Sequence, residues 1–200
     1  MSILLVHGWG FDPGIWAPLR SLQPARDWRC ADLGYFGPAD TGLPPGLELV
    51  VGHSFGCLWA MGHPGLAGVP LLAVNGFTRF AAAPDFPHGT PPRVLARMLA
   101  RLGQAPGEVL RAFHDRCGTP VPEGEPRPAL AADLARMAGG DARADPRPVK
   151  ALAAADDPLV PPAMSRQCFP RDLTLLPQGG HVLPLTRPGE LARAIGQMLG

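Results

Sequence analysis

The 200-residue sequence predicts one α/β domain, in which a parallel sheet of about six strands carries helices on both faces. Two observations predict this fold class. Short, nearly continuous apolar runs bounded by Gly, Pro and Asp recur along the chain, as strands covered on both faces of a parallel sheet require. Stretches with helical periodicity lie between several of these runs, and such alternation is typical of a parallel sheet with crossover helices.

The apolar runs predict strands at 3–6, 28–33, 47–52, 70–74, 149–155 and 172–176. Helical patterns predict helices at 13–23, 54–63, 91–102, 106–117, 129–138 and 188–199. Proline lies near the first turn of four of these helices, where its missing N–H costs no hydrogen bond, at Pro13, Pro91, Pro106 and Pro188. The helix starts that these prolines indicate therefore agree with the starts of the helical patterns.

Two stretches depart from the alternation. The segment 37–46 is short and rich in Pro and Gly, so we expect a loop between the second and third strands. The segment from about 76 to 148 contains helical patterns broken by Pro and Gly but no convincing strand. It is too long for a simple crossover, and we expect a small helical cap inserted into a single domain that spans 1–200.

Composition excludes several classes of function. The net charge is +1 and 18% of residues are charged, which gives no general attraction to nucleic acid or to an anionic membrane. The four cysteines are scattered without metal-ligand spacing, so we expect free thiols in a reducing compartment and no metal site. The sequence carries no recognisable targeting segment and no apolar stretch long enough to span a bilayer, which favours a cytoplasmic location.

The strongest functional signal is the sequence Gly-His-Ser-Phe-Gly at 52–56, between a predicted strand and a predicted helix. In that context the serine lies on a tight turn whose strained backbone needs glycine on both sides. Ser54 is then presented at a helix N-terminus as a nucleophile, and the N–H of Phe55 can face a developing oxyanion. The alternative interpretation is a glycine-rich turn with a capping serine.

A second glycine turn, His-Gly-Trp-Gly at 7–10, directly follows the first predicted strand. The backbone N–H of Trp9 can approach the same oxyanion from the opposite side. The alternative is an ordinary strand-exit loop with a structural histidine. The aromatic side chains of Trp9, Phe55 and Trp59 are candidates to line a substrate pocket, although each could equally be a core aromatic.

The expected base and acid come late in the chain. His181 follows the last predicted strand in a glycine loop, where an imidazole can take the serine proton and return it to the leaving group. Two adjacent aspartates, Asp156 and Asp157, end the preceding strand and leave the register of the acid open. One of them can accept the His181 Nδ1–H, and the other is expected to cap the following turn.

The order Ser, Asp, His in these contexts resembles the α/β-hydrolase superfamily over nearly the whole chain. Four stretches are similar to pimeloyl-[acyl-carrier protein] methyl ester esterases of biotin synthesis: His-Gly-Trp-Gly at 7–10, the segment 32–37, Asp-Pro-Leu-Val-Pro at 157–161, and the Gly180-His181 loop. The resemblance implies Asp157 as the acid, an α/β-hydrolase fold, and hydrolysis of a methyl ester without metal or cofactor. The sequence departs from that family by a shorter N-terminus, no helix between strands two and three, and a short insertion.

Arg93, Arg97 and Arg101 recur every four residues on one predicted helix and therefore share a face. Such a basic stripe can receive an acidic carrier protein or the phosphate of its phosphopantetheine arm. The alternative is a solvated helix face in an arginine-rich chain.

The sequence thus predicts a serine carboxylesterase that forms an acyl-enzyme. Its most specific expected substrate is the methyl ester of pimeloyl-[acyl-carrier protein], and it has no nucleic-acid or membrane partner. The first alternative is a general carboxylesterase or thioesterase for small acyl substrates. The second is a non-catalytic ligand-binding protein that has kept the fold.

Overall fold

The computed structural model describes residues 2–200. Its six strands form one sheet in the order β2-β1-β3-β4-β5-β6, and every neighbouring pair is parallel. The strands are β1 (Ser2–Val6), β2 (Asp27–Ala31), β3 (Leu47–His53), β4 (Leu71–Val74), β5 (Val149–Ala154) and β6 (Leu173–Leu176). The six runs predicted from the sequence are these strands, so the predicted fold class is confirmed.

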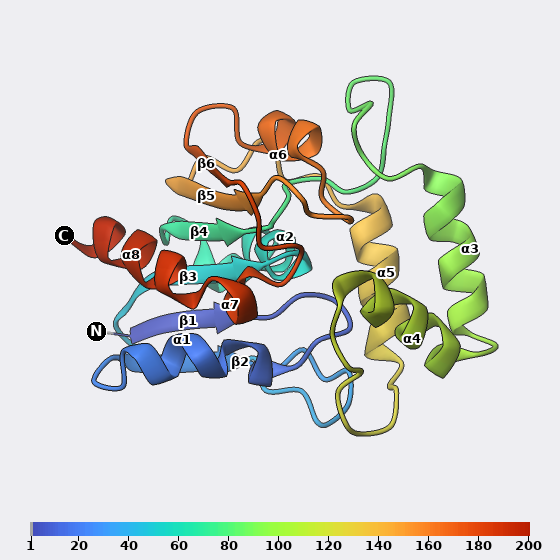
Figure 1. Ribbon diagram of the computed structural model, residues 1–200, viewed down its shortest axis with the longest axis horizontal. Coiled ribbons are helices and arrows are strands. Elements are labelled where there is room, and N and C mark those ends of the chain that lie inside the picture. Colours follow the sequence, from blue (N-terminus) through green and yellow to red (C-terminus); the bar gives the residue numbers. More distant parts are fainter. Residues whose placement is uncertain (1) are drawn as a thin grey trace.

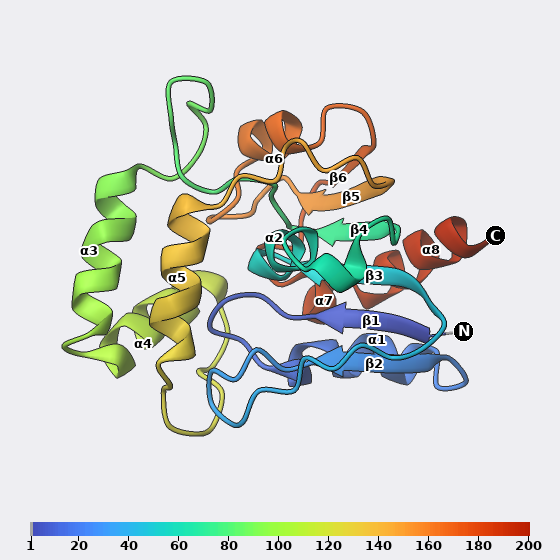
Figure 2. The ribbon, with the colours of Figure 1, turned by 180° about the vertical axis from the view of Figure 1, so that it is seen from behind.

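Two hydrophobic cores lie on the two faces of this sheet, because successive residues of a strand point to opposite sides. Ile3 and Leu5 pack with residues of α1 (Ala17–Leu22), α7 (Leu183–Thr186) and α8 (Pro188–Leu199). Leu4 and Val6 pack with residues of α2 (Phe55–Met61) and α6 (Pro162–Cys168). Figure 1 shows α1 and α8 in front of the sheet, and Figure 2 shows the sheet from behind.

The segment expected to be a helical cap contains α3 (Pro92–Leu102), α4 (Pro106–Cys117) and α5 (Ala129–Gly139). These helices lie beyond the carboxyl ends of the strands, so the cap covers the edge at which strand-end loops meet (Figure 1). At its base the chain enters and leaves through an isolated antiparallel bridge between Arg79 and Asp141. The cap therefore stands over the place where ligands bind in open parallel sheets.

The helices of the structure differ only slightly from those predicted from the sequence. The segment 13–23 starts as a 3₁₀ turn, Pro13–Trp16, before α1, and a second such turn spans Pro64–Leu66. The short helices α6 and α7 were not predicted, because seven and four residues are too few to show a helical period. The link from β2 to β3 contains no helix, as predicted. Within residues 2–200 we find no helix with the length and apolarity needed to cross a bilayer.

Candidate active site

Ser54 lies on a strained turn between β3 and α2. Its φ is 53° and its ψ is −121°, and residues other than glycine rarely adopt a conformation with positive φ. A Cβ added at Gly52 would lie 2.7 Å from the Cys57 backbone, and one at Gly56 would lie 2.4 Å from the Val6 carbonyl oxygen. Glycine is therefore required on both sides of the serine. The Ser54 side chain caps no helical N–H, which leaves its hydroxyl free for another partner.

That partner is His181, which joins the hydroxyl to a carboxylate. The Nε2 atom of His181 lies 3.1 Å from Ser54 Oγ, and its Nδ1 atom lies 2.8 Å from Asp157 Oδ2. All three residues are buried, with Ser54 7%, His181 1% and Asp157 5% exposed. The arrangement brings together a hydroxyl, an imidazole and a carboxylate in the order that proton transfer from the serine requires.

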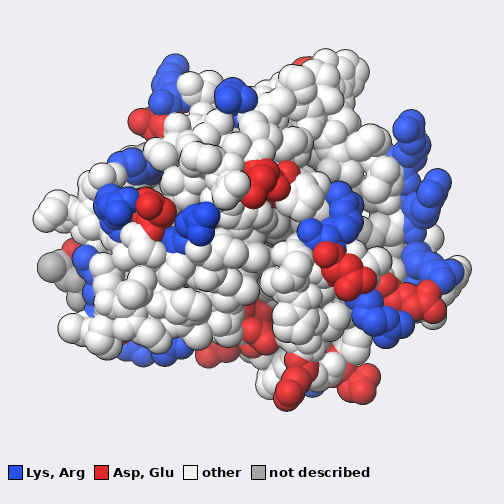
Figure 3. All heavy atoms as spheres, viewed as in Figure 1, with Lys and Arg blue, Asp and Glu red and all other residues white. Residues whose placement is uncertain are grey.

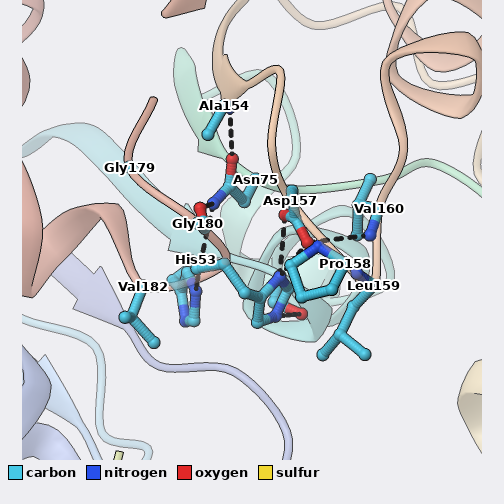
Figure 4. A network of polar contacts seen from close by, with 12 residues as sticks. His53, Asn75, Ala154, Asp157, Pro158, Leu159, Val160, Gly179, Gly180 and Val182 are labelled. Carbon is cyan, nitrogen blue, oxygen red and sulfur yellow. Dashed lines mark hydrogen bonds and ion pairs between the residues drawn. The ribbon is translucent and has the colours of Figure 1, made fainter. Parts of the chain in front are cut away.

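Backbone groups hold the Asp157 carboxylate. Its Oδ1 accepts hydrogen bonds from the N–H groups of Leu159, at 2.7 Å, and Val160, at 3.0 Å (Figure 4). Donors of this kind fix the orientation of a carboxylate. The carboxylate that contacts His181 Nδ1 is thus held in one orientation by the main chain that follows it.

Asp156 has a different place from the one expected. It does not cap the following turn but accepts hydrogen bonds from the N–H groups of Gly180, at 2.8 Å, and Gly179, at 3.2 Å. The Gly180 hydrogen bond is the main cause of a lowered pKa for the Asp156 carboxyl. Adjacent aspartates therefore divide two tasks: Asp157 contacts the imidazole, and Asp156 holds the loop that carries it.

The turn after β1 passes directly against Ser54. A Cβ at Gly8 would lie 2.9 Å from the Ser54 Cβ, so only glycine allows this approach. Within residues 2–200, the backbone N–H groups of Trp9 and Phe55 donate to no protein acceptor. The indole N–H of Trp9 donates to the Leu130 carbonyl of α5 at 2.8 Å, which anchors the turn to the cap. One unpaired N–H group thus belongs to Phe55, the residue after Ser54, and the other belongs to Trp9, on the turn that passes against Ser54.

A cavity of about 400 Å³ opens beside Ser54 and His181. Its walls are mostly apolar and come from Trp9, from the cap and from the loop after β5, including Leu95, Met98, Phe113 and Leu159. A second groove of about 630 Å³ between α3 and α4 shares Val94, Met98, Phe113 and Arg116 with this cavity. The two spaces therefore adjoin, and a ligand longer than the first cavity can continue into the groove.

Two of the three aromatics proposed as pocket walls do not reach this cavity. Phe55 and Trp59 lie four residues apart on one face of α2, and both side chains pack in the hydrophobic core instead of lining the cavity. The Arg136 guanidinium of α5 lies 6.0 Å from the centre of the Phe55 ring, and the ring centres of Trp59 and His63 are 4.9 Å apart. Neither residue lines this cavity, because a helix that starts at the serine carries both side chains into the hydrophobic core, which is the alternative that the sequence left open.

The basic stripe lies on α3, on the outer side of the cap (Figure 3). Arg93, Arg97 and Arg101 are all exposed, and the last two line the groove between α3 and α4. Glu108 of α4 forms an ion pair with Arg101 across that groove. The structure therefore brings Arg97 and Arg101 to the groove, but Arg93 is not among its lining residues.

Sequence analysis missed Asn75, which is fully buried directly after β4 and contacts the loop of His181. A signal was present, because a polar residue follows four apolar strand residues at the edge where the site forms. Arg116, on the helix that follows the basic stripe, lines both the cavity and the groove. That contact depends on how the cap folds over the sheet.

Comparisons with known proteins agree with this fold. A curated relative, the biotin biosynthesis bifunctional protein BioHC of Cellvibrio japonicus, is 31% identical over 134 residues, which are 56% of this chain and 26% of the relative. The chain thus spans about a quarter of that relative's length.

Two solved structures are similar over 100% of this chain. A thermophilic esterase from Thermogutta terrifontis has a TM-score of 0.73 and 19% identity over 89% of its own length. An esterase from Exiguobacterium antarcticum has a TM-score of 0.77 and 12% identity over 92% of its length. At these identities the likeness is one of fold. The model of the Alpha/beta hydrolase family matches residues 3–194, and the chain belongs to that family.

Proposed function

We propose that the protein is a serine carboxylesterase that works through an acyl-enzyme on Ser54. The observation that carries the proposal is the buried hydrogen-bonded series Ser54–His181–Asp157 beside an apolar cavity. A fold retained only for ligand binding has no need of a strained serine turn and an oriented imidazole. Strained backbone at such a site has a functional reason more often than a structural one.

In the first half-reaction, Ser54 Oγ attacks the ester carbonyl carbon while His181 Nε2 takes its proton. The negative charge moves to the carbonyl oxygen, where the N–H groups of Trp9 and Phe55 can stabilise it. Each such donor contributes roughly 10²–10³ in rate in enzymes where one has been removed. The protonated imidazole, stabilised by Asp157, then gives its proton to the alkoxide, and the alcohol leaves.

In the second half-reaction, His181 removes a proton from water and the resulting hydroxide attacks the acyl-enzyme. The tetrahedral intermediate uses the same two N–H donors. Its collapse breaks the bond to Ser54 Oγ, which takes the proton back from His181 and releases the carboxylic acid. Every proton is thus carried by one imidazole, and the chemistry is complete with residues of the chain and water.

The substrate we propose is the methyl ester of a pimeloyl chain carried on acyl carrier protein, in biotin synthesis. The resemblance of the sequence motifs supports it, and so does the similarity to a protein named for biotin biosynthesis. The apolar cavity and adjoining groove suit an extended acyl chain. Arg97, Arg101 and Arg116 line the groove and offer charge to a phosphate or an acidic carrier.

A comparison of two esters separates this proposal from a general esterase. We expect kcat/KM for the carrier-linked pimeloyl methyl ester to exceed that for methyl pimelate without a carrier by at least about tenfold, because carrier contacts contribute binding energy remote from the reacting bond. Equal values for the two esters, with rapid turnover of p-nitrophenyl acetate, would favour the general carboxylesterase instead.

Charge reversal of the basic stripe tests the carrier contact. In a variant with Arg93, Arg97 and Arg101 all changed to Glu, we expect the ratio of kcat/KM for the carrier-linked ester to that for p-nitrophenyl acetate to fall about tenfold, since exposed charge pairs contribute up to about 1 kcal/mol each. The fall should shrink as salt is added.

The matched control for this variant reverses three exposed arginines away from the cap, Arg29, Arg171 and Arg193. It changes the net charge equally and should leave the ratio within twofold of the wild-type value. An unchanged ratio in the stripe variant, or an equal fall in both variants, would rule out docking on α3.

A further inference from the structure

We infer that Asn75 and His53 are positioning residues, which hold the main chain of His181 so that its imidazole stays between Ser54 and Asp157. The inference rests on the proposed function of these three residues. It concerns side chains that do not touch the reacting atoms and act only through the loop of the base.

The loop that carries His181 needs such anchors. It joins β6 to α7 and contains two consecutive glycines with positive φ, 154° at Gly179 and 62° at Gly180. Glycine has the largest conformational freedom of any residue, so this backbone does not orient a side chain by itself. An imidazole on a free loop would spend much of its time away from the serine.

Asn75 provides the first anchor. Its Nδ2 donates to the carbonyl oxygens of Gly180 and His181, both at 2.8 Å, and its Oδ1 accepts from the Ala154 N–H at 2.9 Å (Figure 4). Ala154 is the last residue of β5 and precedes Asp157 by three positions. One buried amide therefore joins the strand end that presents the acid to the loop that presents the base.

His53 provides the second anchor, from the residue before Ser54. Its Nε2 donates to the His181 carbonyl oxygen at 2.9 Å. Burial lowers the pKa of His53 well below its ordinary value, so the ring is neutral and carries one proton. That proton lies on Nε2, and Nδ1, which is buried without a hydrogen-bond partner among the described residues, is left as a bare lone pair. Among the described residues, the ring thus makes a single hydrogen bond, to the carbonyl oxygen of His181.

The backbone of Asn75 points to the same conclusion. Apart from Ser54, it is the only residue other than glycine with positive φ among residues 2–200, at 43°. Such a conformation persists only where the surrounding structure holds it, and it clusters at functional sites. In this conformation the Asn75 side chain makes three hydrogen bonds to the segments that carry the acid and the base.

Together the two side chains tie the strand of Ser54, the strand end of Asp157 and the loop of His181 to one another. The His181 carbonyl oxygen accepts two hydrogen bonds, from Nδ2 of Asn75 and Nε2 of His53. A misplacement of about 1 Å at a catalytic group costs on the order of 10² in rate. Loss of either anchor is therefore expected to lower kcat and to leave KM nearly unchanged, because neither residue lines the substrate cavity.

The test compares Asn75→Gly, His53→Phe and His53→Gln with wild type, using p-nitrophenyl butyrate. Glycine accepts the positive φ of Asn75, so that variant removes the amide without adding backbone strain. Phenylalanine keeps a ring at position 53 but has no donor, whereas glutamine keeps an N–H. We expect kcat per folded molecule to fall about 10–100-fold in Asn75→Gly and His53→Phe, with KM within about twofold, and glutamine to restore part of the loss.

Thr78→Val is the matched control. It removes a buried hydroxyl from the same segment after β4, and that hydroxyl has no hydrogen-bond partner among the described residues. It should keep the wild-type kcat. A second readout does not depend on turnover: the proton between His181 Nδ1 and Asp157 should give a far-downfield ¹H NMR resonance in wild type and Thr78→Val, and a broadened or missing one in Asn75→Gly.

Ser54→Ala separates the two ways in which the account can fail. If that variant keeps its activity, the proposed function itself is wrong. If it is inactive while Asn75→Gly and His53→Phe keep wild-type kcat and the downfield resonance, the positioning role alone is overturned. A loss of activity that only follows loss of folded protein, with the resonance intact in the folded fraction, also overturns it.

Discussion

Replacement of Ser54 by alanine is expected to lower kcat for p-nitrophenyl butyrate by about 10⁴–10⁶-fold, because no acyl-enzyme can form without Oγ. The residual rate reflects substrate binding and the N–H donors of Trp9 and Phe55. Alanine meets the same backbone strain at φ 53° as serine does, and among the described residues the serine hydroxyl has a hydrogen bond only to His181. The melting temperature should therefore change little, and kcat can be compared directly.

Ser165→Ala is the control for this change. Ser165 is fully buried in α6, and its hydroxyl has no hydrogen-bond partner among residues 2–200. The two variants remove the same atom from buried serines, and only one of these serines contacts an imidazole. Ser165→Ala should keep kcat within about twofold. A Ser54→Ala variant that retained a tenth of the wild-type kcat would contradict nucleophilic catalysis at this position.

The two aspartates should differ sharply. Asp157→Asn is expected to lower kcat by about 10⁴-fold, because an amide beside Nδ1 favours the wrong tautomer of His181 and no longer stabilises the imidazolium. Asp156→Asn keeps one oxygen, which can accept the shorter hydrogen bond from Gly180 N–H, and loses the acceptor of Gly179 N–H. Asp156 does not contact the imidazole, so the fall in kcat should stay below about tenfold. Both are measured as kcat at a pH where wild type is most active.

The ranking of these two variants is the informative result, because the substitution is the same and the positions are adjacent. Asp157 is buried and accepts from His181, Leu159 and Val160, whereas Asp156 is exposed. A larger effect at Asp156, or equal effects at both, would contradict the assigned acid.

The sequence could predict those parts of the site that local chemistry determines. The glycines around Ser54 are needed because strand, turn and helix pack closer than a Cβ allows. This requirement is visible in the sequence as glycine two positions before and two positions after the serine. The strands are visible in the sequence as nearly continuous apolar runs, because both of their faces are covered. His181 could be found because a histidine in a glycine loop after the last strand has few other reasons to be there.

Contacts between distant segments could not be predicted in the same way. The residues alone left the register of Asp156 and Asp157 open, since a shift of one position exchanges their directions. Whether Phe55 and Trp59 line the cavity or the core also depends on tertiary packing, since the Arg136 side chain of α5 lies over the Phe55 ring. The contacts of Asn75 join three segments whose relative placement exists only in the folded chain.

Covalent labelling with a fluorophosphonate tests the central claim most directly. Such a reagent reacts with a serine hydroxyl only where a neighbouring base activates it, and mass spectrometry locates the adduct. We expect one adduct per chain on the peptide that contains Ser54, no adduct there in Ser54→Ala, and much slower labelling in His181→Gln. A wild-type chain that stays unlabelled, or is labelled at another residue to the same extent in Ser54→Ala, would contradict the account.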